Sequence, residues 1–497
     1  MIMEGRQIVD KESFAKYFVV ILIACFAASK IDAQSLTLQK AVELALQNND
    51  RILQYKEKLQ QKTFDKRSSL GNLLPQISLS SSYTHLNDPL TMDLEPIRRA
   101  MISLHAKDQV SITSINSQLA GGPAINDPSS PVYQTVYQKV YAAYNNALPE
   151  FVETLKEQNY PSLSIAAVQP IFTGGKIRAG IKAAESEKSA AKFELKQIEN
   201  EVIKETAGYY IATILARDVV EVRKEVLSAM NKHRDKAEKL YSQGIIAKYH
   251  LLRAEVAVSE ANRNLISDQN RLEIVKLALK KCMNSDSFIP EISDSLLYKP
   301  VTDSLNHFLS ETENHQPVYS IVESKRNLAH QKTASQISAF LPSIAVFGKY
   351  EFFKDYLSAL EPQWAVGVTA NLPIFNGFKN YNNYKSSRHL EKELQKFESA
   401  IKDDISLLVE KTYRDMRNNQ EQFILLSADI NLAEENLRQC KSRFENGYGT
   451  SLEVIDAQLV LEKNRIERLI ALHNYYKSYI DLSTATGNLE PVLEICN

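Results

Sequence analysis

A long segment in the middle of the chain carries hydrophobic residues at the spacing of an amphipathic helix. From Lys176 to about Leu240, apolar residues recur every three or four positions with charged residues between them; they include Ile198, Val202, Ile203, Ala207, Tyr210, Ile214 and Val220. This period places the apolar side chains on one face of an α-helix. A helix of about 65 residues is about 100 Å long, at about 1.5 Å per residue. Residues 36–72, rich in Leu, Gln, Glu, Lys and Ala, predict another helix.

Four shorter segments alternate between apolar residues and small or polar ones, which is the pattern of a β-strand with one apolar face. They lie at residues 76–84, 162–167, 344–352 and 363–374. The apolar face of the last segment carries Trp364, Val366, Val368, Ala370, Leu372 and Ile374. Strands of about 9–11 residues can cross a bilayer at a tilt, although a half-buried soluble sheet gives the same alternation.

The chain also contains an internal repeat. The motif Pro-Ile-Phe-Thr-Gly-Gly-Lys at residues 170–176 recurs 203 residues later as Pro-Ile-Phe-Asn-Gly-Phe-Lys. A Leu-Pro-x-Ile motif at residues 74–77 recurs at 341–344, so the first copy holds about 64 extra residues between its two motifs. We therefore expect two structural repeats, 34–302 and 303–497, each with a helix, a strand pair and a long helical hairpin.

Helix-breaking residues are scarce and mark the turns between the predicted helices. The 497 residues include only 15 Gly and 16 Pro, and no Pro occurs within 171–289 or 374–490. Length alone suggests about three domains, but such proline-free stretches indicate very long helices. Gly244 and the pair Gly447 and Gly449 are the strong breaks near the middle of the two stretches. Each predicts the tip of an antiparallel helical hairpin, where Gly can adopt the left-handed closing conformation.

Residues 1–33 predict a signal peptide rather than folded structure. An apolar run of twelve residues, Tyr17–Ala28, follows two lysines. This run is too short for a permanent transmembrane helix but suits the core of a signal peptide, with cleavage expected after Ala33. The alternative is a bacterial lipobox, Leu-Ile-Ala-Cys, in which Cys25 is the acylated residue.

Composition excludes several classes of protein. The 59 Lys and Arg residues nearly cancel the 60 Asp and Glu residues, so the chain lacks the basic footprint of a nucleic-acid binder. The nine histidines show no metal-binding spacing, and Cys282, Cys440 and Cys496 match neither a zinc site nor a redox pair. No phosphate-binding loop or nucleophile elbow occurs. We therefore expect no enzyme activity, no metal and no cofactor.

Four strands per chain cannot close a membrane barrel alone. Open strand edges are not tolerated in lipid, because each unpaired backbone group costs several kcal/mol. Two chains would give a barrel filled by its own side chains, whereas three chains give twelve strands and room for a lumen. Cyclic symmetry also lets the long helices pack side by side. The strands therefore favour an oligomer, and a trimer leaves room for a channel.

Taken together, the two repeated motifs, the Gly-bearing tips and the Ala-Thr-Gly ending at residues 485–487 resemble the outer-membrane efflux proteins of the TolC type. The resemblance covers residues 34–497. It implies a mostly α-helical homotrimer, with a twelve-stranded β-barrel in the lipid of the outer membrane continued by an α-helical barrel through the periplasm. It also implies a passive exit duct of a tripartite efflux pump for small molecules, which docks to a periplasmic adaptor protein and an inner-membrane transporter.

The resemblance further implies a constriction near the second tip, where acidic residues of the family ring the closed tunnel. The matching positions in this chain are Glu453 and Asp456. Their i, i+3 spacing puts both carboxylates on one helix face, and in a trimer six carboxylates would surround one axis and attract cations. The alternative is an ordinary solvated helix face.

The first tip departs from the family pattern, because His250 and Arg253 occupy the equivalent positions. Arg253 is a candidate to pair with Glu453 or Asp456 of a neighbouring helix and so lock the closed state. Alternatively, His250 is simply an exposed residue of the tip. Gly449 stands where some family members have an Arg, so any contact made by that Arg is absent.

Contact with the adaptor is expected at the two tips, where glycines allow sharp turns and small side chains leave room for a docking hairpin. The expected contact residues are Gln243, Gly244, Ile245, Ile246, Ala247, Asn446, Gly447, Tyr448, Gly449 and Thr450.

The extra residues of the first repeat, roughly 87–160, match the family least. They predict a loop-rich insertion, because Pro89, Pro96, Pro123, Pro128 and Pro131 interrupt the segment. Four tyrosines follow at helical spacing: Tyr133, Tyr137, Tyr141 and Tyr144. Strand direction in the family places this insertion outside the cell, where it could narrow the mouth or meet an external partner; a loop that packs on itself is the alternative.

Two rival functions stay open. A type I protein-secretion duct has the same fold as an efflux duct. A secreted coiled-coil structural protein with a small soluble sheet has similar periodicities.

Overall fold

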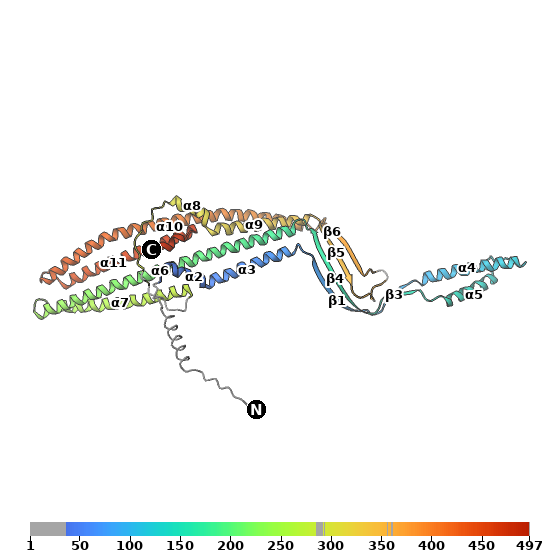
Figure 1. The fold of residues 1–497 in the computed structure, drawn as a ribbon, viewed down its shortest axis with the longest axis horizontal. Helices are drawn as coiled ribbons and strands as arrows, with labels where there is room; N and C mark the ends of the chain where they lie inside the picture. The colour runs from blue at the N-terminus through green and yellow to red at the C-terminus, as the bar shows by residue number, and fades with distance from the viewer. Residues whose placement is uncertain (1–35, 285–291, 293, 355, 359–360, 497) are drawn as a thin grey trace, which may run out of the picture. The chain divides into compact units, whose positions relative to one another are not determined.

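The computed structural model describes residues 36–284, 292, 294–354, 356–358 and 361–496. The predicted signal peptide, with Cys25, lies outside the described residues. The chain forms two compact units, a helical unit and a sheet unit (Figure 1). The helical unit comprises the described residues of Met1–Arg67, Ile181–Thr333 and Lys385–Asn497, and the sheet unit comprises Ser68–Gly180 and Ala334–Tyr384.

Eight α-helices begin or end in the helical unit. Their bounds are Leu38–Asn48 (α2), Asp50–Gly71 (α3), Lys176–Ser242 (α6), Lys248–Met283 (α7), Leu305–His315 (α8), Pro317–Ile337 (α9), Lys379–Glu445 (α10) and Ser451–Thr486 (α11). The prediction of very long helices is confirmed, because α6 and α10 each contain 67 residues. The predicted helix over 36–72 is two helices, separated at Asn49. No helix in the described part of the chain has an apolar stretch long enough to cross a membrane.

The two tips have the same backbone geometry. Gly244 and Gly447 both lie in the left-handed region, with φ of 72° and 76°. After α6, the Ile245 N–H donates to the Leu240 carbonyl at 2.9 Å; after α10, the Tyr448 N–H donates to the Arg443 carbonyl at 2.9 Å. These bonds, together with the adjacent glycine N–H bonds, form a Schellman motif at each tip. Gly244 and Gly447 therefore each lie in a turn between two long helices.

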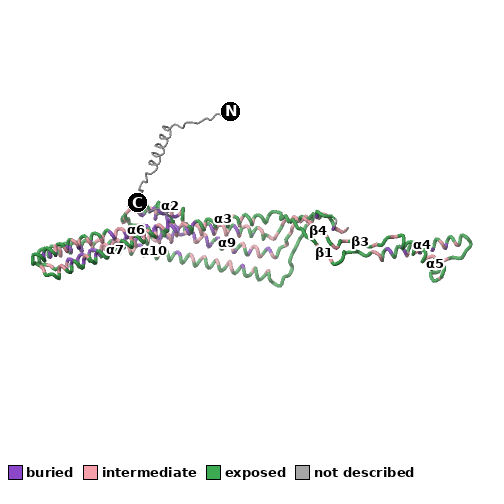
Figure 2. Tube along the Cα trace, turned by 90° about the horizontal axis from the view of Figure 1, so that it is seen from below, coloured by how far each residue is buried: buried purple, intermediate pink, exposed green. Residues whose placement is uncertain are grey.

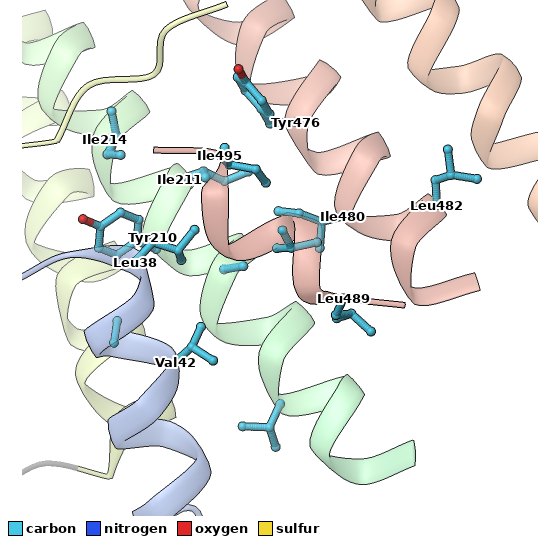
Figure 3. Packing of buried hydrophobic residues seen from close by; sticks show 14 of the residues in the cluster. Leu38, Val42, Tyr210, Ile211, Ile214, Tyr476, Ile480, Leu482, Leu489 and Ile495 are labelled. Atoms are coloured by element: carbon cyan, nitrogen blue, oxygen red, sulfur yellow. The ribbon is translucent and has the colours of Figure 1, made fainter. Parts of the chain in front are cut away.

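The largest hydrophobic core of the helical unit gathers residues from α2, α6, α11 and the C-terminal segment. Figure 3 shows Leu38 and Val42 of α2 beside Tyr210 and Ile211 of α6, and Ile480 of α11 nearby. Buried residues appear along α2, α6 and α7 in Figure 2. The Tyr475 hydroxyl donates to the Lys299 carbonyl at 2.9 Å and accepts from the Val301 N–H at 3.0 Å, so the segment before α8 is held against α11.

The sheet unit contains four antiparallel strands in the order β1-β4-β5-β6. Their bounds are Gln76–His85 (β1), Asn159–Phe172 (β4), Ser343–Glu351 (β5) and Trp364–Asn371 (β6). All four predicted strands are present. The last ends at Asn371, earlier than predicted, because Pro373 has no N–H to donate to a ladder.

The register gathers the apolar residues on one face of the sheet. Leu79 pairs with Ile165, Ile165 with Tyr350, and Tyr350 with Trp364. The exposed apolar residues on this face are Ile77, Leu79, Tyr83, Ile165, Val346, Tyr350, Trp364, Val366 and Val368. The opposite face carries serine and threonine on β1, and small or polar residues on β6. The sheet therefore has one apolar and one mainly polar face.

The insertion at 87–160 is not the loop-rich segment that its prolines predicted. It contains a two-stranded ribbon, Leu90–Asp93 (β2) and Val152–Lys156 (β3), and two helices, Glu95–Leu119 (α4) and Pro131–Ala147 (α5). Pro96 and Pro131 lie in the first turn of α4 and α5, where a missing N–H costs nothing. The helical spacing of the tyrosines is confirmed, because the rings of Tyr133 and Tyr137 stack at 6.3 Å.

Candidate functional site

The two tips lie beside each other at one end of the helical hairpins. A side-chain carbon added at Gly447 would lie 3.8 Å from Cγ2 of Ile245, which belongs to the first tip. Gly449 also needs a small residue, because an added Cβ would lie 2.9 Å from the Phe444 nitrogen. The predicted adaptor-contact residues all lie in these two turns and are mostly exposed, Tyr448 by 83%.

Glu453 and Asp456 lie in the first turns of α11, and the structure gives them different surroundings. The Thr450 hydroxyl caps α11 by accepting the Glu453 N–H at 3.3 Å. The Glu453 side chain is half-buried, and its Oε2 is buried without a hydrogen-bond partner in the described part of the chain. Asp456 is exposed. The two carboxylates are therefore near each other in sequence but unequal in solvation.

His250, at the start of α7, stands at the position of the first repeat that corresponds to Glu453. Its ring lies 3.9 Å from the ring of Tyr249, and it is half-buried rather than fully exposed. Its Nδ1 is buried and, within the described residues, has no hydrogen-bond partner. Arg253 is exposed and forms no ion pair with Glu453 or Asp456 of its own chain among the residues described.

A buried histidine that sequence reasoning missed connects α6 to the second tip. His233 Nε2 lies 2.8 Å from the Oγ of Ser451, and the imidazole lies 4.8 Å from the ring of Phe444. Ser451 is the first residue of α11 and is fully buried. Burial lowers the pKa of His233 to about 4, and the positive charge of Lys441 adds to this effect.

A cationic groove lies between α6 and α10 next to this histidine. It has a volume of about 640 Å³ and is lined by Lys224, Lys232, Lys236 and Lys441 together with Glu225, Glu445 and His233. Burial also lowers the pKa of Lys441. The lysines of this groove lie on two different hairpins, so the sequence alone could not bring them together.

Two arginines cross-connect the hairpins. Arg223 of α6 donates from Nε to Asp268 of α7 at 2.7 Å and also bonds Glu462 of α11. Arg465 of α11 bonds Glu225 of α6 at 2.9 Å and Glu434 of α10 at 2.7 Å. Glu462 is buried, so water screens its ion pair with Arg223 only weakly. These contacts tie together the four helices that end at the tips.

Among the described residues, no group of three or more His, Cys, Asp or Glu side chains is placed so that it could hold a metal ion.

The sequence model for outer membrane efflux proteins matches residues 134–285 and 313–488. The chain belongs to the outer membrane efflux protein family. Members of this family are efflux channels rather than enzymes, and membership supports an outer-membrane location. Helices α2, α3 and α4 and strands β1 and β2 of this efflux protein lie before the matched region.

Solved structures have the same fold as this efflux protein. A membrane protein from Pseudomonas aeruginosa is 16% identical, with a TM-score of 0.69 over 91% of this chain and 90% of its own. CusC, studied for conformational changes that accompany folding and transmembrane channel formation, is 15% identical, with a TM-score of 0.70 over 92% and 93%. The CmeC outer membrane channel of Campylobacter jejuni is 16% identical, with a TM-score of 0.68 over 92% and 86%. No curated protein sequence matches the chain.

Proposed function

We propose that this efflux protein is the passive exit duct of a tripartite pump for small molecules. The single observation that carries the proposal is the two-faced sheet of four strands, with apolar side chains on one face and small or polar side chains on the other. Strands β1 and β6 have one unpaired edge each within the described chain. Three chains that pair these edges would form a closed twelve-stranded barrel with its apolar face toward lipid.

In this proposal the long helices of three chains form a periplasmic α-helical barrel. The chain comprises two structural repeats, 34–302 and 303–497, each of which ends in a helical hairpin. Support comes from the equal lengths of the paired helices, since α6 and α10 have 67 residues and α7 and α11 have 36. The matching Schellman motifs at the two tips support the same repeat.

The tips dock the periplasmic adaptor, and the turns after them form the constriction. Nδ1 of His250 and Oε2 of Glu453 are both buried without a partner in the described chain, although buried polar atoms are normally hydrogen-bonded. Their equivalent places in the two repeats suit bonds to a neighbouring protomer or to the adaptor. Asp456 adds negative charge beside Glu453.

Arg253 locks the closed state in this proposal by pairing with Glu453 or Asp456 of a neighbouring protomer. Its exposure leaves the guanidinium available for such a contact. The substitution Arg253→Ala should raise the conductance of the reconstituted channel. An unchanged closed state would contradict the role of Arg253 as a lock. It would not contradict the proposed function as an exit duct.

Energy for transport comes from an inner-membrane transporter, because the sequence holds no nucleotide-binding motif. A deletion strain tests the whole function. Deletion should make cells retain small toxic molecules, and the intact gene should restore their export. Loss of a secreted protein with unchanged small-molecule export would identify a type I secretion duct instead.

A tip variant separates docking from folding. Tyr448→Glu places a charge on an exposed side chain at the second tip, so export should fall while the trimer and its conductance in bilayers are retained. Normal export by this variant argues against adaptor contact at the second tip. A water-soluble monomer without pores would indicate a secreted coiled-coil structural protein.

A further inference from the structure

Helix α4 of the insertion has two apolar faces. Helix α5 covers only one of them. Toward α5, the buried residues are Arg98, Ile102, Ala106, Val110 and Ser114. On another side of α4, six large apolar residues are between 43% and 82% exposed: Ile97, Met101, Leu104, Ile112, Ile115 and Leu119. We call these six residues, together with Asp108, the α4 stripe.

The α4 stripe has the regular spacing of a helix–helix seam. Successive members are separated by four, three, four, four, three and four residues, so the pattern repeats every eleven residues. At about 100° per residue, all seven positions fall within about 80° of the helix circumference. An eleven-residue repeat keeps an apolar seam in contact when helices wind around each other with a right-handed supercoil. Scattered surface residues do not produce such a line.

Nothing in the described part of the chain covers the stripe. Helix α5 packs on the other side of α4, where Arg98 donates to the Asn145 side chain at 3.0 Å and to the Leu148 carbonyl at 2.8 Å. The Ser103 and Tyr137 hydroxyls bond at 3.0 Å on the same side. An apolar row of this length on an exposed helix marks an interaction surface.

We propose that the stripes of three copies of this chain pack together, so that three α4 helices form a parallel bundle at the outer mouth of the channel. This inference rests on the proposed trimer. The β2–β3 ribbon and the two helices connect β1 to β4, which are neighbours in the sheet. Every protomer of a threefold barrel therefore presents α4 from the same barrel end, parallel and in register.

Asp108 is the only polar residue of the α4 stripe. A single polar residue in an apolar seam specifies register and oligomeric state at a cost in stability. Exact threefold symmetry would bring the three Asp108 side chains to one level of the bundle. The bundle narrows the exit, and α5 lies on its outside.

Disulfide crosslinking of the full-length trimer tests the bundle. Leu104→Cys and Ile115→Cys lie on the stripe, whereas Gln109→Cys is an exposed control about a third of a turn away around the same helix. Mild oxidation should join two protomers through either stripe cysteine, because a disulfide needs Cα atoms within about 7 Å. The control variant and the parent chain, with its own cysteines, should give at least tenfold less crosslinked dimer.

A second substitution tests the role of the apolar contact. Adding Ile112→Asp to the Ile115→Cys chain should reduce crosslinking at least fivefold, and adding Gln109→Asp should leave it unchanged. An intact, conducting trimer that shows no stripe crosslink overturns the bundle and indicates that lipid or another protein covers the stripe. Equal crosslinking of Gln109→Cys also overturns it. Absence of any trimer would instead overturn the proposed function.

Discussion

The imidazole Nε2 of His233 lies 2.8 Å from the Oγ of Ser451, and this contact joins the first long helix to the beginning of the helix after the second tip. Ser451 directly follows Thr450, which caps α11. The charged residues that line the groove beside His233 are Lys224, Lys232, Lys236, Lys441, Glu225 and Glu445. A charge on the histidine therefore arises in a groove lined by four lysines and two carboxylates.

The stability of the helical unit should depend on the charge of His233. Burial lowers the pKa of His233 from 6.5 to about 4, so between these values the unfolded chain binds more protons than the folded chain. The stabilisation is fully present above about pH 6.5 and decreases toward pH 4, by up to about 3 kcal/mol. Thermal unfolding followed by circular dichroism should show a lower midpoint at pH 5 than at pH 7.

His233→Gln provides the control for this pH dependence, since an amide can still bond Ser451 but does not titrate. The variant should lose a measurable part of the shift between pH 7 and pH 5. The same shift in the variant and the parent protein would show that other groups cause it.

The arginine ion pairs of the helical unit should differ in strength according to their burial. Arg223→Ala leaves the buried carboxylate of Glu462 without its partner, which should lower the free energy of unfolding by about 3 kcal/mol. Arg414→Ala removes an exposed ion pair with Glu410 and should change the free energy of unfolding by less than about 1 kcal/mol. Urea unfolding of both variants measures the difference. Equal effects would contradict the structural role assigned to Arg223.

Charge at the proposed constriction should control ion selectivity. Replacing Glu453 by Gln and Asp456 by Asn removes two carboxylates per chain, so the cation preference of the open channel should fall at least twofold. Glu421→Gln removes an exposed carboxylate from α10, far from the tips in sequence, and is the matched control. Reversal potentials in a salt gradient report the selectivity. A double variant with parental selectivity would place the constriction elsewhere.

The two faces of β6 should respond differently to a charge. Val366 lies on the apolar face, so Val366→Lys should reduce insertion into the outer membrane, with a cost of about 2–4 kcal/mol near the centre of the bilayer. Thr369→Lys lies on the polar face and should insert normally. Membrane fractionation and heat-modified electrophoresis quantify the inserted protein. Equal insertion of both variants would contradict the assignment of the faces.

Local patterns revealed much of the fold, because helices and strands impose fixed periods on the sequence. The spacing of Val202, Ala207, Tyr210 and Ile214 marked α6, and the alternation after Gln363 marked β6. Gly244 and Gly447 marked the tips, since few other residues tolerate a positive φ. These signals depend only on neighbouring residues.

Helix α4 was missed because Pro96 was interpreted as a loop signal, although it lies in the first turn of the helix. The contacts of His233 and Arg223 were missed for a different reason. His233 and Ser451 are 218 residues apart, and only the packing of α6 against α11 brings them together. No local period reports which faces of two long helices meet, so such contacts required the structure.

Single-channel recording tests the central claim most directly. The protein, extracted from outer membranes with detergent and purified as a trimer, should form discrete, long-lived conductance steps in a planar bilayer, and Arg253→Ala should enlarge them. A purified, folded trimer that leaves the bilayer electrically silent at every voltage and salt concentration tested, with Arg253→Ala equally silent, would contradict the account of this protein as a channel.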